Sequence, residues 1–365
     1  MHRSIEMNQL QLRRFPVSLV AFWLLACSHT HGERSLDRSR CFTDRQHRSV
    51  CVSDRPHRVS CDDILCFESM LTLGESSRIV QMRDTNTPWM NLDPHVRAIT
   101  RFEQPTLERM LADRIDVAFV YPDPRALECY QRAGVAAFVS QSTTRDAVSA
   151  ESFLAGQKES LLLYGKVLGA RAMQRATLWA SYVDEQVRYV TSRTRALSQQ
   201  RRPSAYYLRG PDALSSHGRR TCTYWYTQFA GADMVTGRAR VEGRGSISAE
   251  QLIMWDPEVV FVGRLYSVDL LLKDPRFRTL RAVRNHEVYP MPAGVFFWDG
   301  GPESVLLMLW VAKTVHPELF ADLDLPSKVR EYYSKFYGVT LGDHSIVSLL
   351  AGRSMDGTRM VTRYN

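Results

Sequence analysis

Arginine and aromatic side chains follow the predicted strands of this chain, and their chemistry suits an anionic ligand. The candidates are Trp89, Tyr121, Arg209, Arg264 and Trp298. Arginine forms bidentate hydrogen bonds with carboxylates, and aromatic faces stack on planar molecules. The five residues could therefore contact a flat, anionic, aromatic-rich ligand such as a catecholate or carboxylate iron chelate. The alternative for each of them is a place in the core or at the rim of a site.

Motifs for catalysis are absent from the sequence. It contains no G-x-S-x-G, no H-E-x-x-H, no Walker-type phosphate loop and no glycine string of the dinucleotide-binding kind. We therefore expect a protein without a cofactor and without chemistry of its own. A secreted two-lobed enzyme is the alternative from another class.

Seven cysteines raise the question of disulfides or metal. Residues 41–60 hold a ten-residue near-repeat, CFTDRQHRSV and CVSDRPHRVS, in which Cys41, His47, Cys51 and His57 have metal-ligand types. Arginines flank each histidine and repel a cation, and a hairpin turn at residues 44–47 would place Cys41 opposite Cys51. We expect a cross-strand disulfide or two free thiols there and no metal site. Pairing among Cys61, Cys66, Cys129 and Cys222 stays open.

The charge balance is moderately basic. Lys and Arg number 47 against 39 Asp and Glu, a formal net charge of +8. The arginines are spread along the chain, and no nucleic-acid-binding motif is present. Nucleic acid is therefore not an expected partner.

Residues 1–26 are typical of an export signal. Arg13 and Arg14 precede a short apolar run over 15–26, which ends in Leu-Leu-Ala before Cys27. That string resembles a bacterial lipobox, in which the cysteine is acylated; ordinary cleavage without a lipid is the alternative. We expect the protein at the periplasmic or extracellular face of the cell membrane, held there by a lipid anchor only. Residues 27–38 are then a tether.

The rest of the chain alternates short apolar strands with helices. Runs such as residues 117–120 (VAFV) and 259–262 (VVFV) are apolar on both faces, as in buried parallel sheets. Residues 170–200 contain no Gly or Pro and predict one helix about 45 Å long. The pattern predicts an α/β fold of two Rossmann-like lobes with mostly parallel sheets, joined by one long α-helix. The expected boundaries are 39–168 for the first lobe, 169–200 for the linking helix, 201–350 for the second lobe and 351–365 for a tail.

An internal repeat supports two related lobes. TLERMLADRIDVAFV (106–120) aligns without gaps with SAEQLIMWDPEVVFV (248–262), so that Glu108 matches Glu250. Each copy predicts an acid near a helix start, the helix and a buried strand. Paired acids at symmetric sites could meet a twofold partner, although a first-turn Glu is also favoured by the helix dipole alone.

These features together resemble one family. The lipobox, the hairpin ending in DRPHRV, LERMLADRIDVAFV, the long helix, ISAEQLIMWDPEVVFV and PESVLLMLWVAKTVHPELF occur in the order and spacing of class III substrate-binding proteins of bacterial ABC importers. Members of that family carry ferric siderophores, cobalamin or haem. The resemblance covers roughly residues 39–350, with His47 where the hairpin's usual Gly would stand.

The resemblance implies a function. The protein would capture a small-molecule metal chelate, a ferric siderophore, in a cleft between the lobes and deliver it to an ABC permease dimer with its ATPase. Other cargoes are cobalamin, haem, molybdate or a nickel or cobalt chelate. Glu108 and Glu250 would dock onto the two permease subunits, and a stiff linking helix would permit only small closure. Ligands of open α/β sheets bind beyond the carboxyl ends of the strands, where Tyr121, Arg209 and Arg264 are expected.

Overall fold

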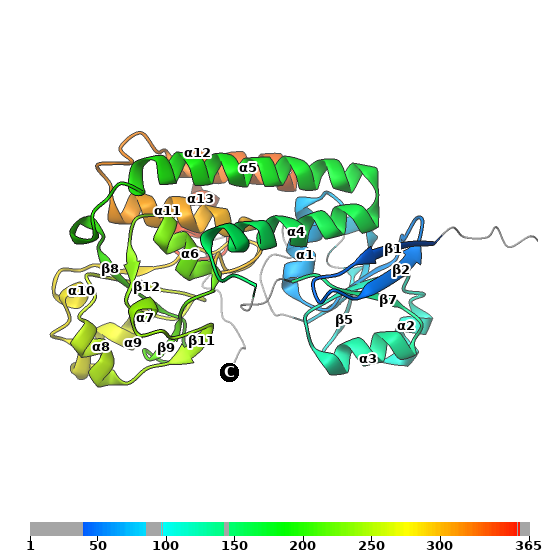
Figure 1. Ribbon diagram of the computed structural model, residues 1–365, viewed down its shortest axis with the longest axis horizontal. Coiled ribbons are helices and arrows are strands. Elements are labelled where there is room, and N and C mark those ends of the chain that lie inside the picture. The colour runs from blue at the N-terminus through cyan, green and yellow to red at the C-terminus, as the bar shows by residue number, and fades with distance from the viewer. Residues whose placement is uncertain (1–38, 85–95, 97, 142–145, 356, 358–365) are drawn as a thin grey trace, which may run out of the picture. The chain divides into compact units, whose positions relative to one another are not determined.

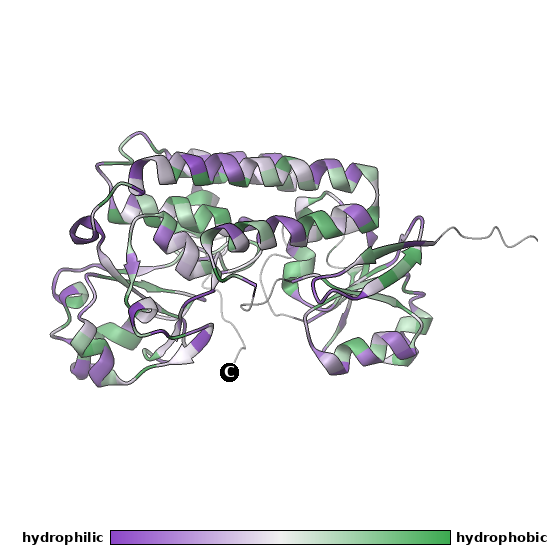
Figure 2. Ribbon diagram, viewed as in Figure 1, coloured by the Kyte–Doolittle hydropathy of each residue, from purple (hydrophilic) through white to green (hydrophobic). Residues whose placement is uncertain are grey.

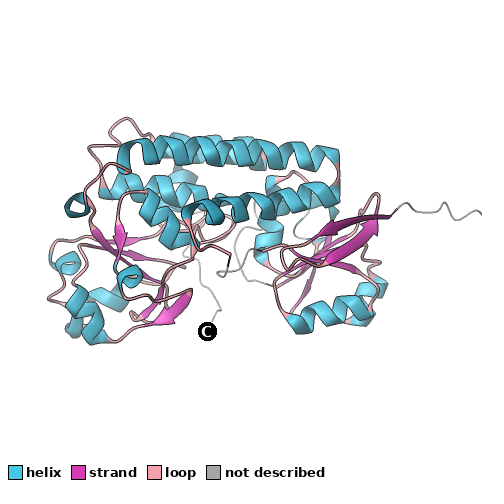
Figure 3. Ribbon diagram, viewed as in Figure 1, coloured by secondary structure: helices cyan, strands magenta, loops and turns pink. Residues whose placement is uncertain are grey.

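The computed structural model describes residues 39–84, 96, 98–141, 146–355 and 357. The chain divides into two compact units, residues 1–37 and 38–365, and all described residues belong to the second. Within it, two α/β lobes each contain one sheet, and strands and helices alternate in both (Figure 3). Cys27 and Trp89 lie outside the described residues.

A disulfide-bonded hairpin precedes the first lobe. Strands β1 (Ser39–Thr43) and β2 (Ser49–Ser53) pair antiparallel with Cys41 opposite Cys51, and the two sulfurs are bonded. The expected register is confirmed, and of the alternatives for these cysteines the structure shows the disulfide. His47 has a φ of 59°, the conformation that favours Gly at this turn position.

The first lobe is a five-stranded, fully parallel sheet in the order β5-β4-β3-β6-β7. Its helices begin at residues whose side chains accept hydrogen bonds from the first turn. Asp63 caps α1 in this way, and Asp123 caps α3, whose first residue is Pro124. Every residue of β6 is buried, as the apolar run predicts. The elements are β3 (Val59–Cys61), α1 (Ile64–Thr72), η1 (Ser76–Arg78), β4 (Ile79–Arg83), β5 (Thr100–Phe102), α2 (Leu107–Ala112), β6 (Val117–Val120), α3 (Pro124–Arg132) and β7 (Ala136–Val139).

The second lobe repeats this plan around β8 and β12, which pair in parallel, and adds a short antiparallel ribbon of β9 and β11. The ribbon was not predicted, because its strands are three residues long and carry no apolar alternation. The elements are β8 (Ser204–Leu208), β9 (Ser215–His217), α6 (Cys222–Phe229), β10 (Asp233–Met234), α7 (Val235–Arg238), β11 (Arg244–Ser246), α8 (Ala249–Trp255), β12 (Val259–Val262), α9 (Asp269–Leu272), η5 (Pro275–Phe277), α10 (Arg281–Arg284) and β13 (Val288–Pro290).

The internal repeat occupies equivalent places in the two sheets. Asp116, before β6, donates its backbone N–H to Arg58 O, and its carboxylate accepts the Arg58 amide. Glu258, before β12, donates to Ser204 O, and its carboxylate accepts the Ser204 amide at 2.7 Å. In both lobes, therefore, an acid at the equivalent position joins two neighbouring strands by hydrogen bonds, β6 to β3 in the first lobe and β12 to β8 in the second.

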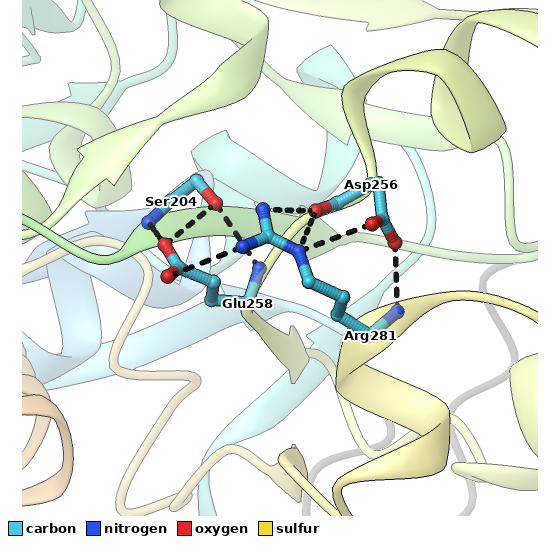
Figure 4. Close-up of polar contacts among 4 residues, drawn as sticks. All are labelled: Ser204, Asp256, Glu258 and Arg281. Carbon is cyan, nitrogen blue, oxygen red and sulfur yellow. Dashed lines mark hydrogen bonds and ion pairs between the residues drawn. The ribbon is translucent and has the colours of Figure 1, made fainter.

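In the second lobe an arginine completes this fastening (Figure 4). Arg281 contacts Asp256 Oδ2 at 3.0 Å and Glu258 Oε1 at 3.3 Å, and its backbone amide donates to Asp256 Oδ1. Ser204 is the first residue of β8 and Glu258 directly precedes β12, so the cluster lies at the amino ends of the strands. Its charges are paired with one another, which indicates a structural role.

Two long helices connect the lobes. Helix α4 (Ala150–Leu168) is followed after Gly169 alone by α5 (Ala170–Thr194), and the two pack side by side (Figure 1). Gly169 has a φ of 112°, which a side chain would strain, and a Cβ on Gly165 would lie 2.8 Å from Met173 Cα. Hydrophilic and hydrophobic residues alternate along α5 (Figure 2), as expected of a helix with one buried face.

Helix α5 is shorter than the predicted 170–200. It ends at Thr194, and η4 (Gln199–Arg201) follows after a turn. Arg202 donates to Thr194 O at 3.0 Å, so a side chain from beyond the helix satisfies a carbonyl at its end. The helix still contacts both lobes, since Arg175 donates to Thr72 O at the end of α1 and to Phe336 O at 2.7 Å.

The C-terminal helices pack on α5 and complete the second lobe. They are η6 (Pro302–Ser304), α11 (Val305–Val315), α12 (Leu325–Tyr332), η7 (Tyr333–Tyr337) and α13 (Asp343–Leu350). Helix α11 is buried over most of its length. No helix among the described residues is long and apolar enough to cross a bilayer.

Candidate functional site

A cavity of about 870 Å³ lies at the carboxyl ends of the strands of both sheets. In the first lobe β3 leads into Asp63, β6 into Tyr121 and β7 into Gln141; in the second, β8 leads into Arg209 and β12 towards Arg264. This is where ligands bind in open α/β sheets. The cavity is therefore the candidate site.

Four arginines, all from the second lobe, line the cavity: Arg209, Arg220, Arg244 and Arg264. Arg264 binds Asp299 through two hydrogen bonds, Nε–Oδ2 at 2.6 Å and Nη2–Oδ1 at 3.1 Å. Burial alone would raise the pKa of Asp299, but the charge and hydrogen bonds of Arg264, with the His217 ring and the Tyr207 hydroxyl, together outweigh burial, and the pKa is lowered. The charge of Arg264 is thus balanced within the protein.

Several contacts hold Asp299 and Arg264 in place. The Tyr207 hydroxyl donates to Asp299 Oδ2 at 2.8 Å, and the Arg264 guanidinium carbon lies 5.6 Å from the Phe296 ring centre and 5.1 Å from that of Phe297. Such aromatic neighbours stabilise a cation. Arg264 therefore forms a rigid, partly buried corner of the site.

Arg209 differs from Arg264 because none of the described residues pairs with its guanidinium, and its Nε is buried without a hydrogen-bond partner. Burial, together with the neighbouring charges of Arg264 and Arg244, lowers the pKa of Arg209. A buried cation without a counter-ion is costly, and an anionic ligand would remove that cost. Arg209 is therefore the strongest sign of an anion-binding site.

His217 lies in the same wall without adding charge. It is buried, and its Nδ1 lies 3.0 Å from the Thr223 hydroxyl. Burial lowers the pKa of His217 to about 3, so the ring is neutral at physiological pH. It can exchange hydrogen bonds with a ligand but does not act as a charge switch.

The cavity wall from the first lobe is acidic and polar. It contains Asp63, Asp146, Gln141 and Gln157, and Tyr121 at the edge is 52% exposed. Among the described residues that line the cavity, no arginine, lysine or histidine comes from this lobe. The two walls therefore differ in charge.

The sequence-predicted residues separate into three groups. Tyr121, Arg209 and Arg264 line the cavity. Trp298 is fully buried in the core and is not among the lining residues; Phe296, two positions earlier, takes that place. Trp89 falls outside the described residues. Sequence reasoning missed Arg220, which follows β9, and Arg244, the first residue of the unpredicted β11. It also missed Asp63, although an acid two residues after a strand was a usable signal.

The remaining cysteines resolve into one pair and two thiols. Cys61 at the end of β3 is bonded to Cys66 in the first turn of α1, while Cys129 and Cys222 are free. The bond closes the short loop that contains Asp63, so it fixes part of the cavity wall. Within the described ranges, no three His, Cys, Asp or Glu side chains are placed to hold a metal ion.

Two buried carboxyl groups meet where α1 contacts η6. Glu68 and Glu303 are both almost completely buried, and the Glu303 amide donates to Glu68 Oε1 at 2.5 Å. Neither carboxylate forms an ion pair with a described cationic side chain. Burial raises the pKa of Glu303 to about 7, and burial together with the Glu303 charge raises that of Glu68 well above its usual value.

This pair predicts that stability falls as the pH rises. Because the folded carboxyl groups hold protons that the unfolded ones release near pH 4.5, the stabilisation is complete at acid pH and is lost as the pH passes through about 7. We expect Glu68→Gln to raise the midpoint of thermal unfolding at pH 8 by several degrees and to flatten its decline between pH 5 and 8. Differential scanning calorimetry measures both. A variant as pH-dependent as the wild type would contradict this assignment.

A sequence profile of the family described as periplasmic binding protein matches residues 67–294. The chain belongs to the periplasmic binding protein family. A structure of similar fold is the periplasmic solute-binding protein from Veillonella parvula, with a TM-score of 0.70 at 19% identity, covering 86% of this chain and 97% of that one.

Individual relatives of this periplasmic binding protein differ in cargo. The molybdate-binding protein MolA of Haemophilus influenzae is 33% identical over 135 residues, which span 36% of this chain and 38% of that relative. The structure of MolA bound to molybdate superposes with a TM-score of 0.73 at 22% identity, covering 83% of this chain and 99% of that one. A protein of an Fe³⁺-hydroxamate transport system from Saccharomonospora viridis gives a TM-score of 0.61 at 19% identity, covering 75% and 98%.

The predicted docking acids occupy equivalent surface positions of this periplasmic binding protein. Glu108 and Glu250 are each the second residue of a helix, α2 and α8, and both are exposed. Each is followed three residues later by an exposed apolar side chain, Leu111 and Ile253. Hydrogen bonding to Ser248 lowers the pKa of Glu250, which keeps it ionised. Neither acid lines the cavity.

Proposed function

We propose that this periplasmic binding protein captures an anionic metal chelate of the ferric-siderophore kind and delivers it unaltered to an ABC permease dimer with its ATPase. The observation that carries the proposal is Arg209, a partly buried cation that faces the cavity without a counter-ion. Arg244 adds a second positive charge to the same wall, and Tyr121 and Phe296 offer aromatic surface. Carboxylate and catecholate oxygens are natural partners for such a wall.

The size of the site supports a chelate. A cavity of about 870 Å³ lies in the range of sites that enclose drug-sized ligands. A tetrahedral oxyanion, only a few times the ~30 Å³ volume of a water molecule, would leave most of it to solvent. A chelate with several anionic oxygens could engage Arg209 and Arg244 together.

Molybdate is the second candidate, and the likeness to MolA favours it. An oxyanion at Arg209 would use the same unpaired charge with fewer contacts. The propionate carboxylates of haem could meet the same arginines, so the charges in the site do not separate haem from a siderophore. The charges in the site do not single out cobalamin or a nickel or cobalt chelate.

A binding measurement separates these cargoes. Titration with a ferric tris-catecholate, followed by tryptophan fluorescence and calorimetry, should give one site with submicromolar affinity, and molybdate should bind at least about 100-fold more weakly. The opposite order of affinities would establish the oxyanion. Conversion of the chelate during incubation would support a secreted two-lobed enzyme and end the transport proposal.

Membrane attachment through Cys27 is proposed separately, because that residue lies outside the described part of the chain. Acylation of this single cysteine would hold the protein at the membrane surface. Cys27→Ser should release the protein into the soluble fraction with its cargo affinity unchanged. Fractionation of cells that express each form measures this, and membrane association of both forms alike would rule out the anchor.

A further inference from the structure

The two walls of the cavity differ in charge. The second-lobe wall carries four arginines against Asp299 and Glu242, whereas the charged residues described in the first-lobe wall are Asp63 and Asp146. Asp146 interacts with another part of the protein, so Asp63 is the acid in the described first-lobe wall that a ligand group could compensate.

Asp63 is the best-defined acid in that wall. Its Oδ1 accepts the Cys66 amide at 2.7 Å and caps α1, while its Oδ2 is buried in the wall without a hydrogen-bond partner. The nearby cation, Arg83, forms its ion pair with Asp62 and not with Asp63. The charge of Asp63 is therefore only partly compensated, by the helix amides and by Arg83 from β4.

The groups around Asp63 act on its pKa in opposite directions. Burial raises its pKa to about 6, and the Cys66 amide and Arg83 oppose that rise. The other ionisable groups that face it are Asp62, Glu68 on α1 and the Tyr164 hydroxyl on α4. At pH 7.5 Asp63 is thus mostly a carboxylate next to a partly dry cavity, where charge interactions are stronger than in water.

We propose that Asp63 selects the cargo by charge: it favours a chelate whose first-lobe end carries an ammonium group and disfavours small uniform oxyanions. The inference rests on the proposed function, since it assumes that the anionic part of the same cargo lies against the second-lobe arginines. A dipolar ligand matches both walls, whereas a bare oxyanion at Arg209 is repelled from across the cavity.

A matched pair of ferric tris-catecholates tests the attraction: one bears a pendant primary ammonium, and its N-acetyl derivative does not. We expect the wild type to bind the ammonium-bearing chelate at least about 10-fold more tightly at pH 7.5 by calorimetry. Asp63→Asn keeps the helix cap and removes the charge, so it should reduce the preference to less than about 3-fold. Asp63→Ser, also a good cap, serves as a second variant.

Molybdate tests the predicted repulsion between Asp63 and a small oxyanion, and Asp123→Asn serves as the control variant. Asp63→Asn should bind molybdate at least about 5-fold more tightly than the wild type does. Asp123→Asn removes an equivalent helix-capping acid of α3 that is not among the cavity-lining residues, and it should retain the wild-type preference. Both chelates binding equally to the wild type, or both failing to bind, would overturn the role of Asp63, as would a preference that persists in Asp63→Asn. Tight binding of the unmodified tris-catecholate alongside those results would leave the proposed function standing.

Discussion

Replacing Glu108 and Glu250 together by arginine should abolish uptake while the affinity for cargo stays near that of the wild type. The two acids lie at equivalent, exposed positions of the two lobes, outside the cavity, so a permease dimer could meet them with two equivalent salt bridges. Charge reversal turns both attractions into repulsions, and like-charge contacts at an interface cost several kcal/mol. Transport of labelled chelate into cells and calorimetry on the purified protein measure the two quantities.

A matched double variant controls for the change in net charge. Glu128→Arg with Glu318→Arg alters one exposed acid on α3 and one that follows α11, neither of them on α2 or α8, and should transport normally. Loss of cargo affinity in the Glu108/Glu250 variant would instead assign these acids to folding or to the site. Normal uptake by that variant would remove the docking proposal.

Arg209→Leu should weaken binding of the anionic chelate by about 10- to 100-fold. Hydrogen bonds to a charged group contribute roughly 1.5–3 kcal/mol, and Arg209 is the cavity arginine with a buried, partnerless nitrogen. Because no described side chain forms an ion pair with Arg209, the variant should fold at least as stably as the wild type. Arg209→Lys keeps the positive charge but lacks the planar guanidinium group that forms bidentate hydrogen bonds. It should therefore recover only part of the affinity that Arg209→Leu loses.

The control for Arg209 is an arginine outside the cavity. Arg276 is exposed and paired with Asp274, and Arg276→Leu should change the affinity by less than about 2-fold. Calorimetric titration of all four proteins with one ferric tris-catecholate gives the comparison. An Arg209→Leu variant that binds as tightly as the wild type would contradict an anionic cargo at this position.

The lobes and their central strands were predictable from sequence because burial on both faces leaves a continuous apolar run. Residues 117–120 and 259–262 are such runs, and both are fully buried interior strands. The hairpin register was predictable too, since a turn of fixed length sets which residues face each other, as with Cys41 and Cys51.

The composition of the site was less predictable, because it depends on contacts between distant segments. An aromatic residue near a strand end can point into the core or the cavity, and Trp298 is buried where Phe296 is at the surface of the site. The ribbon that brings Arg220 and Arg244 to the cavity has no apolar alternation to reveal it. The end of α5 likewise depends on Arg202, a side chain from beyond the helix.

Native mass spectrometry of the protein purified from iron-starved cells is the decisive test of an anionic cargo bound at Arg209. We expect one intact anionic metal chelate per protein, absent from the Arg209→Leu form and released with its mass unchanged on denaturation. A protein that carries a neutral cargo, or one that releases a chemically altered ligand, would contradict it.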